Sequence, residues 1–478
     1  MPDARPNIVW LMAEDIGHDL ACYGMKAVQT PVLDELARTG RKYTNCFCTN
    51  PICSPNRSAM MVGVHQVVTN SHMHRSNRDQ PLPAPYRPIT SYLREAGYTC
   101  IIGSDVVLSK GRKTDCNFKH EQLGPYDGVS QFGLFDKGCE ISPEDAPFFA
   151  HIQLKVTHRG DWWNGVRRQS EHPVDPAEVE LPPYLADTPK IRLDWATYLD
   201  TVEHADHEVA LLQEDLAGKG LLDNTVIIFI GDNGRCNIRG KGYVHETGLR
   251  VPLIIAGPER WVQQAEVEDV VCTNDISATV LQLAGVPLPA YMEARPLVGT
   301  DRPHSREYVY SARDGWDEVN ECMRTISTKQ HAYIRNYLPE LPYDQHQAYL
   351  DFHRPAVHEM RRLKAEGKLS GPTALFFADR KPAEELYDMV QDPHQLTNLA
   401  DDPASASILA DLQAKMAAWQ GSRVDLGLRD YATRECLPSQ AGKIREWLQR
   451  EKPDEWQRLQ DGEIGEHYTD WARQLREQ

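Results

Sequence analysis

Cys53, Pro55 and Arg57 stand at alternating positions in NPICSPNRSAMMVG, residues 50–63. Proline is well tolerated in the first helical turn and SAMMVGV continues a helical pattern, so Cys53 is expected at or just before a helix N-terminus. Free backbone N–H groups and the helix dipole favour an anion there, and Arg57, one turn later on the same face, can hold it. For a lone cysteine the simpler interpretation is a buried thiol with a surface arginine nearby.

Polar side chains follow two apolar runs. NIVWLM is followed by Glu14 and Asp15, and NTVIIFIG is followed by Asp232 and Asn233. Short apolar runs rich in β-branched residues are typical of buried parallel strands. Ligands of parallel sheets gather at the carboxyl ends of strands, so a functional edge is expected where these residues lie.

Strands and helices alternate along the first part of the chain, which predicts an α/β fold with a mostly parallel sheet covered by helices on both faces. The stretches with this pattern are residues 91–102, 147–158, 194–220, 224–234, 251–257 and 274–289.

The sequence pattern changes after about residue 318. Residues 323–337 resemble a strand pair with a turn, and a charged helix and a helical tail with three tryptophans follow. We therefore predict a catalytic α/β domain over 1–318 and a smaller α+β domain with an antiparallel sheet over 319–478. The amphipathic tail is expected to pack on the body of the protein or on a second subunit of a homo-oligomer.

The composition excludes several classes of function. The chain has 478 residues and a net charge of −17, without a basic run of the kind that binds nucleic acid, so a polyanion can bind only in a locally basic pocket.

No apolar run is long enough to cross a bilayer and no signal peptide is recognised, which predicts a cytoplasmic location, or a periplasmic one if a signal peptide has been removed. Eleven scattered cysteines favour reduced thiols over a disulfide framework.

The spacing of Cys53, Pro55 and Arg57 resembles the signature of the type I sulfatases of the alkaline phosphatase superfamily. The resemblance extends over roughly the whole chain. It implies an alkaline-phosphatase-like fold and oxidation of Cys53 to formylglycine by a formylglycine-generating enzyme that reads this motif in the unfolded chain.

The resemblance also implies a metal site. EDIGHDLACYG, residues 14–24, is similar to the acidic pair that holds calcium in the family, although most members have two aspartates where this chain has Glu14 and Asp15. Asp232 and Asn233 match the second metal block. Oxygen ligands of this kind suit Ca²⁺, Mg²⁺ or Mn²⁺. The simpler interpretation, acids that cap the next helix, accounts for one member of the first pair better than for both.

Three further blocks match the family's catalytic residues. Lys241 and His158 match groups that contact sulfate and the leaving atom. RKTDCNF, residues 112–118, is similar to a branch that includes predicted heparan N-sulfatases, which makes Lys113 the anion-binding lysine. Asp115 stands where many relatives have a histidine that takes a proton from the nucleophile.

The implied reaction is hydrolysis of a sulfate ester or sulfamate, most simply on a glycosaminoglycan-like carbohydrate. A formylglycine diol at residue 53 attacks sulfur, Lys241 and His158 neutralise the leaving atom, and a covalent sulfo-enzyme intermediate then releases sulfate. Roughly half of the following residues are expected to contact substrate. They are His72, His74, Arg75, Arg159, Asp161, Trp162, Trp163, Arg239 and His245.

Two other functions remain open at this point. A phosphonate monoester or phosphodiester hydrolase of the same superfamily can use the same diol and cation. A catalytically silent sugar-binding protein is disfavoured because the motif cysteine, the acids and both lysines are present. A phosphatase with a thiolate nucleophile needs a longer spacing than Cys53 to Arg57.

Overall fold

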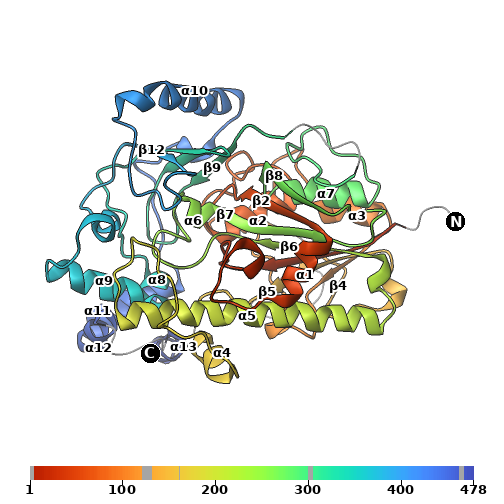
Figure 1. Ribbon diagram of the computed structural model, residues 1–478, viewed down its shortest axis with the longest axis horizontal. Helices are drawn as coiled ribbons and strands as arrows, with labels where there is room; N and C mark the ends of the chain where they lie inside the picture. The colour runs from red at the N-terminus through yellow and green to blue at the C-terminus, as the bar shows by residue number, and fades with distance from the viewer. Residues whose placement is uncertain (1–4, 121–131, 161, 300–304, 462–467) are drawn as a thin grey trace.

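The computed structural model describes residues 5–120, 132–160, 162–299, 305–461 and 468–478, and its largest element is a mostly parallel sheet (Figure 1). The strand order is β4-β3-β5-β1-β6-β7-β2-β8, and only β7 runs antiparallel to its neighbours. The strands are β1 (Asn7–Ala13), β2 (Arg41–Phe47), β3 (Thr99–Ile102), β4 (Lys137–Gly138), β5 (Phe148–Leu154), β6 (Thr225–Gly231), β7 (Arg250–Ala256) and β8 (Ala265–Cys272).

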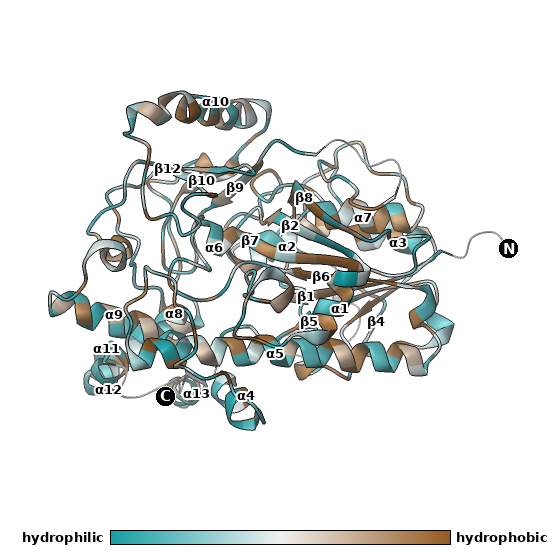
Figure 2. Cartoon of the chain, in the orientation of Figure 1, coloured by the Kyte–Doolittle hydropathy of each residue, from teal (hydrophilic) through white to brown (hydrophobic). Residues whose placement is uncertain are grey.

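Helices cover both faces of this sheet, as the alternation of elements predicts. Every residue of β1, β5 and β6 is buried, and these strands are brown in Figure 2, whereas α5 alternates between teal and brown along its length. On one face α1 (Pro31–Thr39) packs on α5 (Pro189–Gly218), and on the other α2 (Cys53–Val62), α3 (Ile89–Glu95) and α7 (Asp275–Leu283) pack together. The prediction of an α/β fold with a large, mostly parallel sheet flanked by helices is confirmed.

A second, antiparallel sheet has the order β12-β11-β10-β9. Its strands are β9 (Val309–Arg313), β10 (Met323–Ser327), β11 (His331–Asn336) and β12 (Glu384–Asp388). β10 and β11 form the predicted strand pair, and α10 (Ala406–Ser422) packs against them. Because β9 lies before residue 318, the second sheet begins inside the range 1–318, and the boundary itself stays a prediction.

The C-terminal helices have an apolar cluster of their own. α11 (Gln440–Glu451) packs against α12 (Pro453–Gln460), α13 (Tyr468–Arg476) and α8 (Ala348–His353), and α8 contacts α9 (Pro355–Ala365) (Figure 1). Trp447, Trp456 and Trp471 pack with Phe352 of α8 in a cluster separate from the main core. The remaining helices are α4 (Trp163–Gln169) and α6 (Glu246–Leu249).

The described residues contain neither a disulfide nor a membrane-spanning helix. All eleven cysteines lie among them and none forms a disulfide. Within the same ranges, no helix has the length and apolarity needed to span a bilayer.

The sheet brings the carboxyl ends of β1 and β6 together. These strands pair in parallel register up to Ala13 and Gly231, so the residues that follow each strand leave the sheet side by side. A backbone hydrogen bond of 3.1 Å from the Ile16 N–H to the Asn233 carbonyl continues the contact. β5 pairs with β1 on the other side and leads toward His158.

Candidate active site

Cys53 is the first residue of α2 and lies at the floor of a small cavity. Its N-cap, Ile52, has extended backbone angles, and the Asn56 amide fixes the turn by donating to the Asp232 carbonyl at 2.7 Å. The cysteine is 1 % exposed, and its Sγ lies 3.9 Å from Asp15 Oδ1. Burial raises the pKa of the Cys53 thiol well above its usual range, an effect that Asp232 reinforces. The cavity above it has a volume of about 130 Å³.

Arg57 lies one turn further along α2 and is buried. Its guanidinium donates to the carbonyl oxygens of Thr114 at 3.2 Å and Lys113 at 3.1 Å, and lies 3.6 Å from Asp232. Arg57 therefore fixes the segment that carries Lys113 and Asp115 beside the nucleophile helix.

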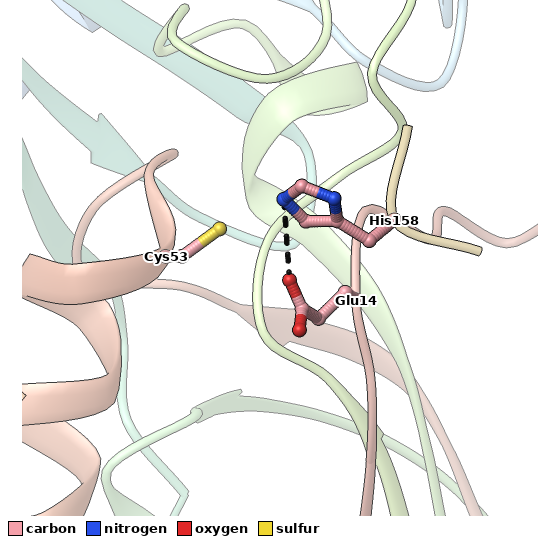
Figure 3. A group of neighbouring side chains, drawn as sticks. All are labelled: Glu14, Cys53 and His158. Atoms are coloured by element: carbon pink, nitrogen blue, oxygen red, sulfur yellow. Dashed lines mark ion pairs between the residues drawn. The ribbon is translucent and has the colours of Figure 1, made fainter. Parts of the chain in front are cut away.

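The four expected metal ligands meet behind Cys53. Asp15 and Asp232 lie with Cys53 in one group of potential ligand atoms, and Glu14, Cys53 and His158 form a second group, shown in Figure 3. Burial acts to raise the pKa of Asp15, but Lys241 and His158 outweigh it and lower this pKa. Burial also raises the pKa of Asp232, although Arg57 opposes the change.

Unsatisfied oxygen atoms show that these residues fit a divalent cation. Glu14 Oε1, Asp232 Oδ2 and Asn233 Oδ1 are buried and accept no hydrogen bond from the residues described. A buried oxygen without a donor is costly, and hard cations such as Ca²⁺ and Mg²⁺ prefer such carboxylate and amide ligands.

Two lysines pair with the acidic residues that follow β1. Lys241 Nζ lies 2.7 Å from Asp15 Oδ1, and Lys113 Nζ lies 2.6 Å from Glu14 Oε2. Burial acts to lower the pKa of Lys241, but Asp15 outweighs it and raises this pKa well above its usual range. Burial likewise acts to lower the pKa of Lys113, but Glu14 outweighs it and raises this pKa, so both ammonium groups stay charged near Cys53.

His158 follows β5 and points at Glu14 (Figure 3), with Nε2 3.4 Å from Glu14 Oε2. The Tyr349 hydroxyl lies 3.5 Å from the same nitrogen and donates to the Arg159 carbonyl at 2.7 Å. Burial, followed by Lys241, lowers the pKa of His158 well below its usual range. Tyr349, which sequence analysis did not identify, therefore positions the histidine.

Asp115 is surrounded by cations. Arg75 donates to both of its oxygens, at 3.0 and 2.9 Å, Arg78 pairs with it, and Lys113 Nζ lies 3.5 Å away. Burial acts to raise the pKa of Asp115, but Arg75, Lys113 and Arg78 hold it well below its usual range. The assignment of Asp115 as the proton acceptor stays a prediction, and its contacts are those of an ionised group that orders Arg75.

The residues expected to bind substrate lie in three different surroundings. His74 and Arg75 line the Cys53 cavity, whereas His72 lines a separate groove of about 1020 Å³. Trp162 lines a second cavity of about 180 Å³, which shares Arg75 and His158 with the first.

The other described residues that are expected to bind substrate contact neighbouring segments of the protein. Arg159 pairs with Asp194, and its guanidinium lies 4.3 Å from the ring centroid of Trp163. Arg239 donates to the carbonyls of His394 and Gln395, and His245 Nε2 lies 3.8 Å from Glu385. Asp161 lies outside the described residues. His151, which lies inside β5, is buried and stacks on Phe135.

Several cavity residues carry no signal in the sequence. They come from the β9–β10 loop, α8 and the start of α11, which approach Cys53 only in the folded chain. They are Trp316, Asp317, Tyr349, Ser439, Gln440 and Ala441.

Comparison with known proteins gives matches over most of the chain. A family model described as Sulfatase matches residues 6–286, and one described as N-sulphoglucosamine sulphohydrolase, C-terminal, matches residues 234–369. An ulvan-active sulfatase of Formosa agariphila is 29 % identical, over 87 % of this chain and 74 % of the relative. The N-sulphoglucosamine sulphohydrolase of Homo sapiens is 27 % identical, over 87 % and 90 %.

The fold is also found among solved structures. The structure of a 2-O GAG sulfatase superposes with a TM-score of 0.61 at 18 % identity, over 91 % of this chain and 95 % of the other. At this identity the likeness concerns the fold.

Proposed function

Because the chain belongs to the sulfatase family of sulfuric ester hydrolases, we propose that it hydrolyses a sulfate ester or sulfamate on a carbohydrate. The observation that carries this proposal is the position of Cys53, at a helix N-terminus on the floor of a cavity that Lys241 and His158 also line. Two cationic side chains, Arg75 and Lys241, line this cavity although the whole chain is acidic, with a net charge of −17. Such a pocket can attract a sulfate group.

In the proposed reaction Cys53 is first oxidised to formylglycine by a formylglycine-generating enzyme, and the hydrated aldehyde is the nucleophile. One diol oxygen bonds to sulfur as the bond from sulfur to the leaving oxygen or nitrogen breaks, which leaves sulfate attached to residue 53. The second hydroxyl then loses its proton, the carbon–oxygen bond to sulfate breaks, and the aldehyde is restored. A thiol or a serine hydroxyl lacks the second hydroxyl that this release needs.

The charged residues have separate roles. Glu14, Asp15, Asp232 and Asn233 would supply the oxygen atoms for a divalent cation, whose positive charge would favour an ionised nucleophile at residue 53. Lys241 stabilises negative charge on the leaving atom, and His158, held by Tyr349, hydrogen-bonds to the same atom. Lys113 and Arg75, which both line the second cavity, stabilise the sulfate oxygens.

The names of the relatives support a sulfated polysaccharide fragment as substrate. One is N-sulphoglucosamine sulphohydrolase and another is an ulvan-active sulfatase. We therefore propose N-sulfoglucosamine and sulfated ulvan oligosaccharides as the substrates to test first.

The test compares turnover of 4-nitrophenyl sulfate, N-sulfoglucosamine, ulvan oligosaccharides and an aryl phosphonate by the wild type and Cys53→Ala. We expect the wild type to hydrolyse the sulfates and the variant to be inactive. Fastest turnover of the phosphonate would favour a phosphonate hydrolase instead.

Intact mass of the peptide containing residue 53 tests the modification. Conversion lowers the mass by sulfur plus two hydrogens minus one oxygen, and hydration adds one water. An unmodified thiol in fully active enzyme would refute the proposed nucleophile.

A further inference from the structure

Asp317 is the carboxylate that lines the Cys53 cavity without a role in the reaction described above. It lies in the loop between β9 and β10, next to Trp316, and shares the cavity with Cys53 and Lys241. The backbone φ of Asp317 is 51°, which is uncommon for a residue other than glycine. Such a conformation persists where the surrounding structure fixes it, and it is found often at functional sites.

Only one oxygen of this carboxylate has a protein donor. Gln347 Nε2 donates to Asp317 Oδ2 at 2.9 Å, and no residue in the described ranges donates to Oδ1. The next residue differs, because Glu318 accepts from the Ala348 N–H and pairs with Arg445 at 3.1 Å. Glu318 therefore joins the loop to α8 and α11, whereas Asp317 Oδ1 can accept a hydrogen bond from a ligand.

The surroundings of Asp317 suit a sugar ring. The rings of Trp316 and Tyr349, with centroids 6.4 Å apart, line the same cavity, and Ser439 and Gln440 at the start of α11 complete it. Aromatic faces pack against the apolar faces of a ligand, while a few fixed polar groups orient it. Lys241 and His158 lie in this cavity too, so the group bonded to the leaving atom occupies it.

The charge of Asp317 is incompletely compensated. Burial raises the pKa of this carboxyl to about 7, and Arg75 acts in the opposite direction. A partly desolvated carboxylate gains from additional hydrogen-bond donors, which the hydroxyl and amino groups of a saccharide provide.

We propose that Asp317 is a specificity-determining residue that accepts a hydrogen bond from a hydroxyl or amino group of the saccharide leaving group. The inference rests on the proposed sulfatase function. It implies selection for saccharide sulfates over aryl sulfates, because an aryl leaving group offers no such donor.

The experiment measures kcat/KM of the wild type and Asp317→Asn for 4-nitrophenyl sulfate and for whichever of N-sulfoglucosamine and ulvan oligosaccharide the wild type hydrolyses faster. Asparagine keeps the size of the side chain and an oxygen that can face Gln347. We expect the value for the saccharide to fall about 10- to 100-fold and that for the aryl sulfate to change less than about threefold. Asp317→Ala should show the same selectivity.

Glu318→Gln is the matched control, because it removes a charge from the adjacent residue, which lies outside the cavity lining. It should lower thermal stability and leave the saccharide-to-aryl ratio unchanged. An equal loss on both substrates in Asp317→Asn, or an unchanged ratio, would overturn the inference while wild-type activity still supports the proposed function. A wild type inactive on every sulfate would instead refute the proposed function itself.

Discussion

At the scale of single residues, the charges of the site compensate one another. Asp115 is the clearest case, since Arg75, Arg78 and Lys113 surround it and it is 5 % exposed. The Asp115 carboxylate is buried although the Arg75 and Arg78 side chains are partly exposed, so removing its charge leaves the surrounding cations without their partner. Asp115 therefore determines where Arg75 points in the cavity.

We expect Asp115→Asn to lower kcat/KM for a sulfate substrate by about 10- to 100-fold, because Arg75 loses an ionised partner. The three cations hold the pKa of Asp115 well below its usual range, so it stays ionised throughout the neutral range. The acid limb of the pH–rate profile, measured from about pH 5 to 9, should therefore remain in the variant. Asp79→Asn, a change at an exposed acid in the same segment as Arg78, serves as the control. Disappearance of the acid limb would identify Asp115 as the proton acceptor.

At the scale of elements, strand ends and one long helix hold the site together. The carboxyl ends of β1 and β6 carry all four proposed metal ligands, so a cation bound there links two strands. α5 lies along one face of the sheet, and its Glu208 accepts from the Leu108 N–H at 2.6 Å. This contact anchors the segment that precedes Lys113.

Removal of the cation should weaken both stability and catalysis. Treatment with a chelator is expected to lower Tm and abolish sulfate turnover, and saturating Ca²⁺ should restore about 2–4 kcal/mol of unfolding free energy. The reason is the set of buried oxygens without donors on Glu14, Asp232 and Asn233. Asn233→Ala should show a smaller response of Tm to Ca²⁺. A Tm that changes with neither chelator nor Ca²⁺ would contradict the proposed metal site.

Glu208→Gln should stabilise the protein at alkaline pH. Burial raises the pKa of Glu208 to about 7, and the Leu108 N–H opposes this rise. An acid whose pKa is raised on folding loses stability as pH rises from its unfolded pKa to its folded pKa, so the full penalty applies above about pH 7. The variant should therefore gain about 1–3 kcal/mol near pH 8 and nothing near pH 4, measured by denaturant unfolding.

Glu214→Gln on the same helix is the control for this experiment, since Glu214 is exposed. It should show no pH-dependent difference from the wild type. A gain in Glu208→Gln that is equal at both pH values would contradict the role of the buried charge.

At the scale of the whole molecule, the active-site cavity is closed by segments far apart in the sequence. Cys53 begins α2 and Lys241 lies in the connection from β6 to α6, whereas Ser439 and Gln440 lie at the start of α11. Those helices depend on their own apolar cluster, so they can loosen without unfolding the main core.

Trp447→Ala is expected to loosen the cavity wall selectively. Trp447 is 2 % exposed, and truncation of a buried tryptophan costs about 3–5 kcal/mol. Hydrogen exchange should accelerate in α11–α13 while β1 and β6 stay protected, and KM for the saccharide should rise more than KM for 4-nitrophenyl sulfate. Arg450→Ala on the exposed side of α11 should change neither the hydrogen exchange of these helices nor KM for either substrate. Uniformly faster exchange across both parts would contradict an independent C-terminal cluster.

Local spacing made one half of the site predictable from the sequence. Cys53, Lys241 and His158 stand in short motifs next to strand or helix ends, and the structure brings them into one cavity. The same holds for the α/β sheet, whose buried strands are continuous apolar runs. Arg239 and His72 also follow such motifs, but their side chains face other surroundings.

The other half of the site depends on tertiary packing. Asp317, Tyr349 and Gln440 belong to connections and helix ends whose sequence resembles many exposed segments. Their approach to Cys53 is determined by how the second sheet and the C-terminal cluster dock on the first. No periodicity or motif encodes that docking, so these residues could be identified only from the structure.

The burial of Cys53 has a consequence for every preparation of this protein. The thiol is 1 % exposed below a cavity of about 130 Å³, too small to admit the active site of another protein. If Cys53 is oxidised as proposed, the modifying enzyme has to reach it before the chain folds, and a chain that folds first would stay inactive. The active fraction of a preparation would then depend on the rate of Cys53 oxidation relative to the rate of folding during synthesis. Slower translation or a larger supply of the maturation enzyme should raise that fraction.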